Sequence, residues 1–122
     1  MLKTIQERLA MLSADVRLVS AREAREELIA NGGALIDVRE PTENSESPVP
    51  TALLIPRGLL EMKATEQFKD PDRPLYLHCG TGVRAQLAAE QLSVMGYTRV
   101  AAITNGIKDV QAAFTDGASS SI

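Results

Sequence analysis

The stretch LYLHCGTGVRAQLAAEQLSVMGY, residues 75–97, contains the pattern that decides the fold. Residues 75–78 suit a buried strand, a short glycine-containing loop follows, and the best helix pattern of the chain comes next. Gly96 is a natural C-terminal cap for that helix, because glycine tolerates the left-handed conformation in which helices end. The stretch therefore predicts a strand, a tight loop and a long helix, in that order.

Strand and helix patterns also alternate on both sides of this unit. Short apolar runs predict further strands at 16–19, 34–38, 51–55 and 99–103. Helix patterns occupy residues 21–30, residues 57–69, which hold one or two short helices, and residues 107–114. The polar, proline-rich segment 39–50 is predicted to be a loop. This alternation predicts an α/β fold, a five-stranded and mostly parallel sheet with helices on both faces.

The 122 residues, of which 44% are hydrophobic, are enough for one domain with a real core. An apolar stripe at helical spacing near the N-terminus is formed by Leu2, Ile5, Leu9 and Leu12. We expect residues 1–15 to form a helix packed on the domain, residues 16–115 to form the domain, and residues 116–122 to be a flexible tail. If the stripe is not buried on its own domain, it marks where a dimer contact would form.

Composition excludes several function classes. One cysteine and one histidine allow no intramolecular disulfide and are too few for a zinc or iron–sulfur site, so we expect neither a metal nor a cofactor. The net charge is −3 and the basic residues are scattered, which argues against nucleic-acid binding. No apolar run approaches the roughly 20 residues of a membrane span. The N-terminus lacks the unbroken apolar region of a signal peptide, so a cytoplasmic location is expected.

Reactive residues gather in the loop that follows the strand at 75–78. In open parallel sheets, ligands bind beyond the carboxyl ends of the strands. Cys79 would lie there at a helix N-terminus with Arg84 close by, and both features favour the nucleophilic thiolate. Gly80 and Gly82 would let backbone N–H groups turn toward the sulfur and stabilise negative charge. We predict a nucleophilic cysteine; the alternative is a buried small hydrophobic residue.

Three other kinds of site have weaker support. Gly80-x-Gly82-x-x-Ala85 satisfies a dinucleotide-binding fingerprint, but the acidic residue expected about 20 positions on is absent. His78 precedes Cys79, and adjacent residues of a strand point to opposite faces, so we expect a satisfied core or edge histidine rather than a catalytic dyad. A serine hydrolase would need a G-x-S-x-G turn, which the sequence does not contain.

With this loop, the chain resembles the rhodanese-like family, specifically its small single-domain sulfurtransferases. The similarity runs from about Val16 to Phe114 and is carried by LIDVREP (35–41), LYLHCGTGVRA (75–85) and MGYTRVAAITNGI (95–107). It implies that Cys79 takes sulfane sulfur from a donor such as thiosulfate and forms a persulfide. The persulfide would then pass its sulfur to cyanide or to a thiol, including a thiol of a sulfur-acceptor protein.

The resemblance also assigns roles to neighbouring residues. The backbone amides of the loop would hold the persulfide, and these are the amides of Gly80, Thr81, Gly82, Val83 and Arg84. The Arg84 side chain would close the cradle. Asp37 and Arg39 match the family's acidic and basic pair, and they would brace the loop or line its mouth.

Spacing and composition separate the remaining alternatives. Related cysteine phosphatases use C-x5-R, whereas Cys79 and Arg84 are spaced C-x4-R, which suits a single sulfur atom better than a phosphate. Phosphatase or arsenate-reducing chemistry is therefore a minor alternative, and a non-catalytic binding or redox-sensing module is the main one. The family often has a basic residue directly after the cysteine, where this chain has Gly80, and this lowers the positive potential around the sulfur.

Overall fold

A single parallel sheet of five strands forms the centre of the computed structural model, which describes residues 1–115. The strands are β1 (Val16–Val19), β2 (Ala34–Asp37), β3 (Leu53–Leu54), β4 (Leu75–His78) and β5 (Val100–Ile103). Their order across the sheet is β1-β5-β4-β2-β3, and each neighbouring pair is parallel. The predicted α/β class and parallel sheet are confirmed. The tail at 116–122, predicted to be flexible, lies outside the described residues.

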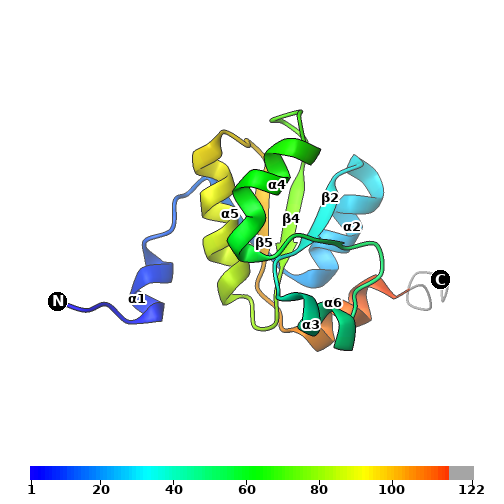
Figure 1. Ribbon diagram of the computed structural model, residues 1–122, viewed down its shortest axis with the longest axis horizontal. Coiled ribbons are helices and arrows are strands. Elements are labelled where there is room, and N and C mark those ends of the chain that lie inside the picture. The colour runs from blue at the N-terminus through cyan, green and yellow to red at the C-terminus, as the bar shows by residue number, and fades with distance from the viewer. Residues whose placement is uncertain (116–122) are drawn as a thin grey trace.

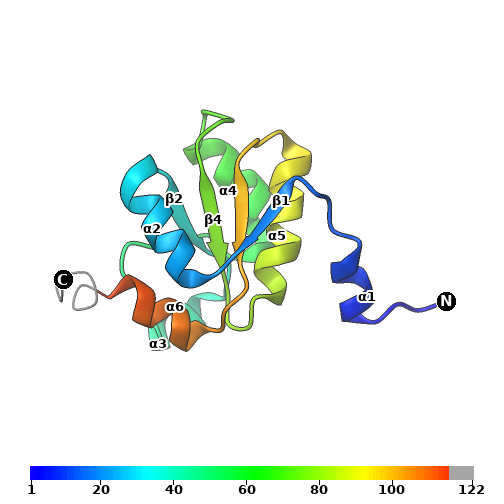
Figure 2. The same ribbon diagram turned by 180° about the vertical axis from the view of Figure 1, so that it is seen from behind.

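Helices cover both faces of the sheet (Figure 1). They are α1 (Ile5–Ala10), α2 (Ala21–Asn31), α3 (Pro41–Glu46), the 3-10 helix η1 (Arg57–Leu59), α4 (Leu60–Gln67), α5 (Val83–Met95) and α6 (Ile107–Phe114). One apolar cluster joins the sheet to α4 and α5, and a second joins it to α2 and α6. Figure 2 shows α2 and α6 together on the opposite face from α4 and α5. None of these helices combines the length and apolar character that crossing a membrane requires.

Strand β4 is the central element, and all four of its residues are buried. Leu75 and Leu77 belong to the cluster under α4 and α5, while Tyr76 belongs to the cluster under α2 and α6. This alternation is the two-residue period of a strand that is covered on both sides. Because side chains alternate between the two faces, Cys79 follows Leu75 and Leu77 on the side of α4 and α5.

Helix α3 corrects the prediction that residues 39–50 form a loop. Pro41 occupies the first turn of the helix, where its missing N–H costs nothing, and its fixed φ suits a helix start. Glu43, two residues later, accepts a hydrogen bond from the backbone N–H of Glu40 at 3.0 Å and so caps the helix N-terminus. The proline that suggested a loop is therefore a helix-initiating residue. Strand β3 is also shorter than the predicted 51–55.

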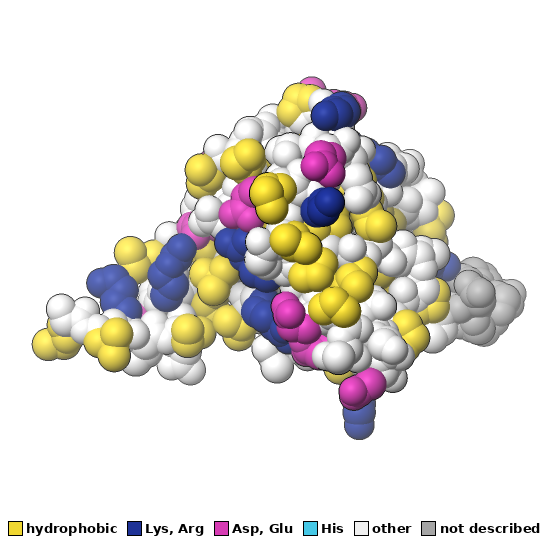
Figure 3. Space-filling model, viewed as in Figure 1, with side chains coloured by type: hydrophobic (Ala, Val, Ile, Leu, Met, Phe, Trp, Pro, Cys, Tyr) yellow, Lys and Arg dark blue, Asp and Glu magenta, His cyan; other side chains and the backbone are white. Residues whose placement is uncertain are grey.

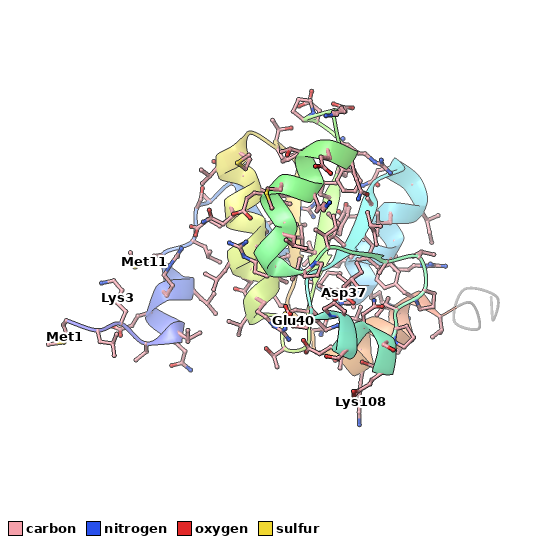
Figure 4. The ribbon with its side chains drawn as sticks, viewed as in Figure 1. Met1, Lys3, Met11, Asp37, Glu40 and Lys108 are labelled. Carbon is pink, nitrogen blue, oxygen red and sulfur yellow. The ribbon has the colours of Figure 1, made fainter. Side chains whose placement is uncertain are left out.

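Helix α1 stands away from the sheet and leaves much of its apolar stripe uncovered. Thr4 and Glu7 form a capping box at its start, but no residue of the helix is buried. Polar contacts with the domain involve Glu90 of α5, which pairs with Arg8 and accepts a hydrogen bond from the Ser13 N–H. Figures 3 and 4 show hydrophobic side chains, including the labelled Met1 and Met11, along this projecting segment.

Thr51 is the only non-glycine residue among 1–115 with a positive φ, at 70°. A β-branched residue is strained there, so we predict that Thr51→Asn, which tolerates this region, raises the free energy of unfolding by about 1 kcal/mol. Thr42→Asn is the matched control, because it makes the same change at an exposed position in α3. Urea denaturation measures both variants. Equal effects at the two positions would contradict the strain at Thr51.

Candidate active site

Cys79 follows the last residue of β4, and two backbone N–H groups point at its sulfur. The N–H of Gly82 lies 3.0 Å from Cys79 Sγ, and the N–H of Ala85 lies 3.3 Å from it. Gly82 is the N-cap of α5, so the sulfur sits at the N-terminus of a 13-residue helix. Unpaired N–H groups and the helix dipole make this end favourable for negative charge. The arrangement can stabilise a thiolate or a negatively charged sulfur bound to it.

Gly82 is required for this turn on two grounds. Its φ is 91°, a conformation that L side chains rarely adopt, and a Cβ atom there would lie 2.6 Å from the Thr104 carbonyl oxygen. The segment after β5 also holds the loop from its other side, because the N–H of Ile107 donates to the Gly80 carbonyl at 3.0 Å. The loop therefore takes its shape from close backbone packing between the ends of two neighbouring strands.

The Cys79 side chain has no exposed surface and belongs to the apolar cluster under α4 and α5. This burial agrees with the alternative of a small hydrophobic residue. An apolar side chain, however, could accept neither hydrogen bond, and the N–H groups of Gly82 and Ala85 would lose their acceptor. Thr81, at the tip of the loop, is exposed. A molecule that reacts with the sulfur must first displace the atoms that cover it.

The Arg84 side chain lies beside Gly80 of the loop, and it is already paired. Its Nη1 and Nη2 atoms donate to Oε1 and Oε2 of Glu43 at 2.8 and 2.9 Å, a bidentate ion pair between α5 and α3. The hydrogen bonds from Arg84, followed by the one from the Glu40 N–H, lower the pKa of Glu43 to about 2. The same pairing raises the pKa of Arg84. Sequence reasoning missed Glu43, and the signal that could have found it was the proline two residues earlier.

Asp37 and Arg39 are both buried and form a second bidentate pair at the end of β2. Arg39 Nε donates to Asp37 Oδ1 at 3.0 Å, and Arg39 Nη2 donates to Oδ2 at 2.9 Å. Arg39 also donates hydrogen bonds to the hydroxyl and the carbonyl oxygen of Ser47, and the Asn44 side chain donates to Asp37 Oδ2 at 3.0 Å. These hydrogen bonds hold α3 and the residue at its end, and the predicted roles of bracing the cysteine loop or lining its mouth stay predictions. Figure 4 labels Asp37, the last residue of β2, and Glu40, the N-cap of α3.

These contacts set the charge state of Asp37. Burial raises the pKa of its carboxyl group, but the hydrogen bonds from Arg39 and Asn44 outweigh burial and leave the pKa below its usual value. Asp37 is therefore ionised at neutral pH. A buried carboxylate of this kind is stable only with such partners.

His78 is a core residue, as predicted, but it is not a satisfied one. Its side chain is fully buried, and neither ring nitrogen has a hydrogen-bond partner among the described residues. Its Nε2 atom lies 4.0 Å from Asp37 Oδ2. Burial lowers the pKa of His78, which keeps the ring neutral at pH 7. Within residues 1–115, no three His, Cys, Asp or Glu side chains are grouped so that they could hold a metal ion.

Comparison with known proteins places this loop in a family. The sequence model of the rhodanese-like domain family matches residues 20–113 of this chain. A sulfurtransferase of Allochromatium vinosum is 36% identical over 73 residues, which cover 60% of this chain and 66% of that protein. A tRNA sulfurtransferase of Yersinia pestis is 32% identical over 98 residues, 72% of this chain and 20% of that protein. The chain thus spans less than two thirds of the length of these relatives.

A solved structure also shares the fold and part of the sequence. It is the polysulfide-sulfur transferase homodimer of Wolinella succinogenes, which is 26% identical. The alignment covers 85% of this chain and 79% of that one, with a TM-score of 0.69. The similarity in fold therefore extends over most of this chain.

The double requirement at Gly82 generates a stability prediction. Gly82→Ala should lower the free energy of unfolding by about 2 kcal/mol or more, because the left-handed conformation is strained and the added methyl group meets the Thr104 carbonyl. Gly58→Ala is the matched control, since a Cβ atom there meets nothing within 4 Å and its φ is not positive. Urea titration of both variants decides the matter, and a Gly82→Ala protein as stable as Gly58→Ala would refute the prediction.

The Glu43 and Arg84 pair generates a pH prediction. The native pKa of Glu43 lies near 2, below the usual value of 4.5, so the unfolded chain takes up this proton first as the pH falls. The stability that the pair contributes is therefore present above pH 4.5 and is lost between about 4.5 and 2. Glu43→Gln should flatten the dependence of unfolding free energy on pH in this window, as measured by urea titrations at several pH values. If unfolding free energy depends on pH as steeply in Glu43→Gln as in the wild-type protein, the predicted contribution of the pair is wrong.

Proposed function

Because the chain belongs to the rhodanese-like domain family, we propose that it is a sulfurtransferase that carries sulfane sulfur as a persulfide on Cys79. The observation that carries this proposal is the pair of N–H groups, from Gly82 and Ala85, that point at Cys79 Sγ. Such donors stabilise charge on sulfur both before and after a second sulfur atom is attached. The names of the relatives from A. vinosum and W. succinogenes describe the same class of reaction.

In the first half-reaction, the Cys79 thiolate attacks the outer sulfur of a donor such as thiosulfate. A bond forms between Sγ and the transferred sulfur, the sulfur–sulfur bond of the donor breaks, and sulfite leaves with the bonding electron pair. The negative charge then resides on the terminal sulfur of the persulfide. The loop amides at residues 80–84, together with that of Ala85, hold this charge at the N-terminus of α5.

In the second half-reaction, an acceptor nucleophile attacks the terminal sulfur and releases the Cys79 thiolate. The sequence contains no second cysteine that could do this. The acceptor is therefore another molecule, either cyanide or a thiol, and the thiol of a sulfur-acceptor protein fits the same chemistry. The tRNA sulfurtransferase of Y. pestis is a relative whose name implies an acceptor beyond its own chain.

The persulfide itself is directly measurable. After incubation with thiosulfate, the intact mass should increase by one sulfur atom, about 32 Da, and dithiothreitol should reverse the increase. Cys79→Ser should abolish the adduct while keeping the fold, because a hydroxyl still accepts the two N–H bonds. The absence of an adduct with thiosulfate, mercaptopyruvate and glutathione persulfide would favour a non-catalytic binding module instead.

A further inference from the structure

We propose that Glu43 determines which class of sulfur donor the site accepts, by neutralising Arg84 so that dianionic donors such as thiosulfate are disfavoured relative to monoanionic ones. Glu43 does not act on the reacting sulfur; it is a positioning residue that acts through Arg84. This inference rests on the proposed sulfurtransferase function, and it names the substrate class that the same loop prefers.

The first argument is the position of the ion pair. A Cβ atom built on Gly80 would lie 3.3 Å from Arg84 Nη2 and 3.8 Å from Glu43 Oε2. The carboxylate is therefore at the loop itself, beside the residue that follows Cys79. Both side chains keep 38% of their surface exposed, so an incoming donor meets the pair as it approaches the loop. Any anion drawn toward Arg84 is also placed beside the charge of Glu43.

The second argument is that Glu43 offsets the positive charge of Arg84 and takes up two of its N–H donors. Nη1 and Nη2 each donate to a different carboxylate oxygen, so the edge of the guanidinium formed by these two nitrogens is already occupied by an anion. Glu43 is fixed in this place because the Glu40 N–H binds its Oε1 and the brace at Asp37 holds the helix. Its low pKa means that Glu43 stays ionised throughout the neutral range.

The third argument concerns the other positive side chains that could attract an anionic donor to the loop. Arg39 is buried against Asp37, and Arg57, which comes shortly after β3, pairs with Glu61 at 3.0 Å. The labelled side chain of Lys108 points away from the body of the protein (Figure 4). The positive groups in direct contact with the sulfur are the N–H groups of Gly82 and Ala85 at the N-terminus of α5, where the helix dipole is equivalent to roughly half an elementary charge. A partial positive charge of this size suits a donor with one negative charge better than a donor with two.

Both donor classes can deliver the same sulfur. With thiosulfate, the Sγ thiolate bonds to the outer sulfur, and sulfite leaves with two negative charges. With methanethiosulfonate, the Sγ thiolate also bonds to the outer sulfur and the sulfur–sulfur bond of the donor breaks. The leaving group is methanesulfinate, which carries one negative charge. The product on Cys79 is identical, so any difference in rate reports on the donor and on its leaving group.

The test compares Glu43→Gln with Glu46→Gln, using thiosulfate and methanethiosulfonate at low ionic strength. In Glu43→Gln the new amide keeps an oxygen that can accept the Glu40 N–H, so the helix cap survives while the charge is removed. Glu46→Gln removes the same charge from the same helix at an exposed position with no described ion pair. The rate of persulfide formation is followed by intact mass, and kcat/KM is determined for each donor.

The quantity that decides is the ratio of kcat/KM for thiosulfate to kcat/KM for methanethiosulfonate. We expect Glu43→Gln to raise this ratio about tenfold, the effect of one charge acting on one additional charge several ångströms away near a protein surface. Added salt should shrink the difference between variant and wild type. Glu46→Gln should leave the ratio within about twofold of wild type, because it is not paired with Arg84.

The outcomes separate this inference from the function on which it rests. Both rates come from one preparation, so the fraction of folded protein cancels in the ratio. An unchanged ratio in Glu43→Gln, or an equal rise in Glu46→Gln, overturns the role of Glu43 while persulfide formation continues. If wild-type protein gains no sulfur from either donor, nor from mercaptopyruvate or glutathione persulfide, the proposed function itself fails, and the inference fails with it.

Discussion

The two N–H groups that converge on the Cys79 sulfur are the interaction on which the rest of the site depends. They meet at one atom only because β4 ends directly before the cysteine and α5 begins shortly after it. So short a connection requires the left-handed backbone at Gly82, and the Thr104 carbonyl leaves no room for a side chain there. The sheet therefore builds the cradle from backbone alone, and no polar side chain is needed to hold the sulfur.

A second layer of contacts reaches the loop from β2. The buried pair of Asp37 and Arg39 binds Asn44 and Ser47, which lie on α3 and at its end. These hydrogen bonds position α3 and with it Glu43, which forms the bidentate ion pair with Arg84 of α5. Burying an ion pair generally adds little to stability, because desolvation offsets the attraction. Its structural effect here is to fix the position of a short helix that has no buried residue of its own.

Much of this architecture could be predicted from the sequence, and the exceptions have physical causes. Apolar periodicity located the strands and the long helices, and the glycines around Cys79 indicated a tight turn. Glu43 could not be found in this way, since it is 41 residues from Arg84 and a proline-rich polar segment such as 39–50 is typical of a loop. The Ala85 amide was missed because a backbone donor has no residue-type signature. The lack of partners at His78 depends on the packing around it, which no local pattern encodes.

The two layers divide the chemistry between backbone and side chains. The charge on the sulfur is stabilised by N–H groups and by a helix dipole, which a side-chain substitution at the rim leaves in place. The charge that an incoming donor meets is set by Glu43 and Arg84, which belong to different helices and can change independently of the cradle. On the proposed function, a change of Glu43 alone would change the preferred donor. The protein's capacity to hold a sulfur atom would remain, because that capacity depends on Gly82 and on the register of β4 and α5.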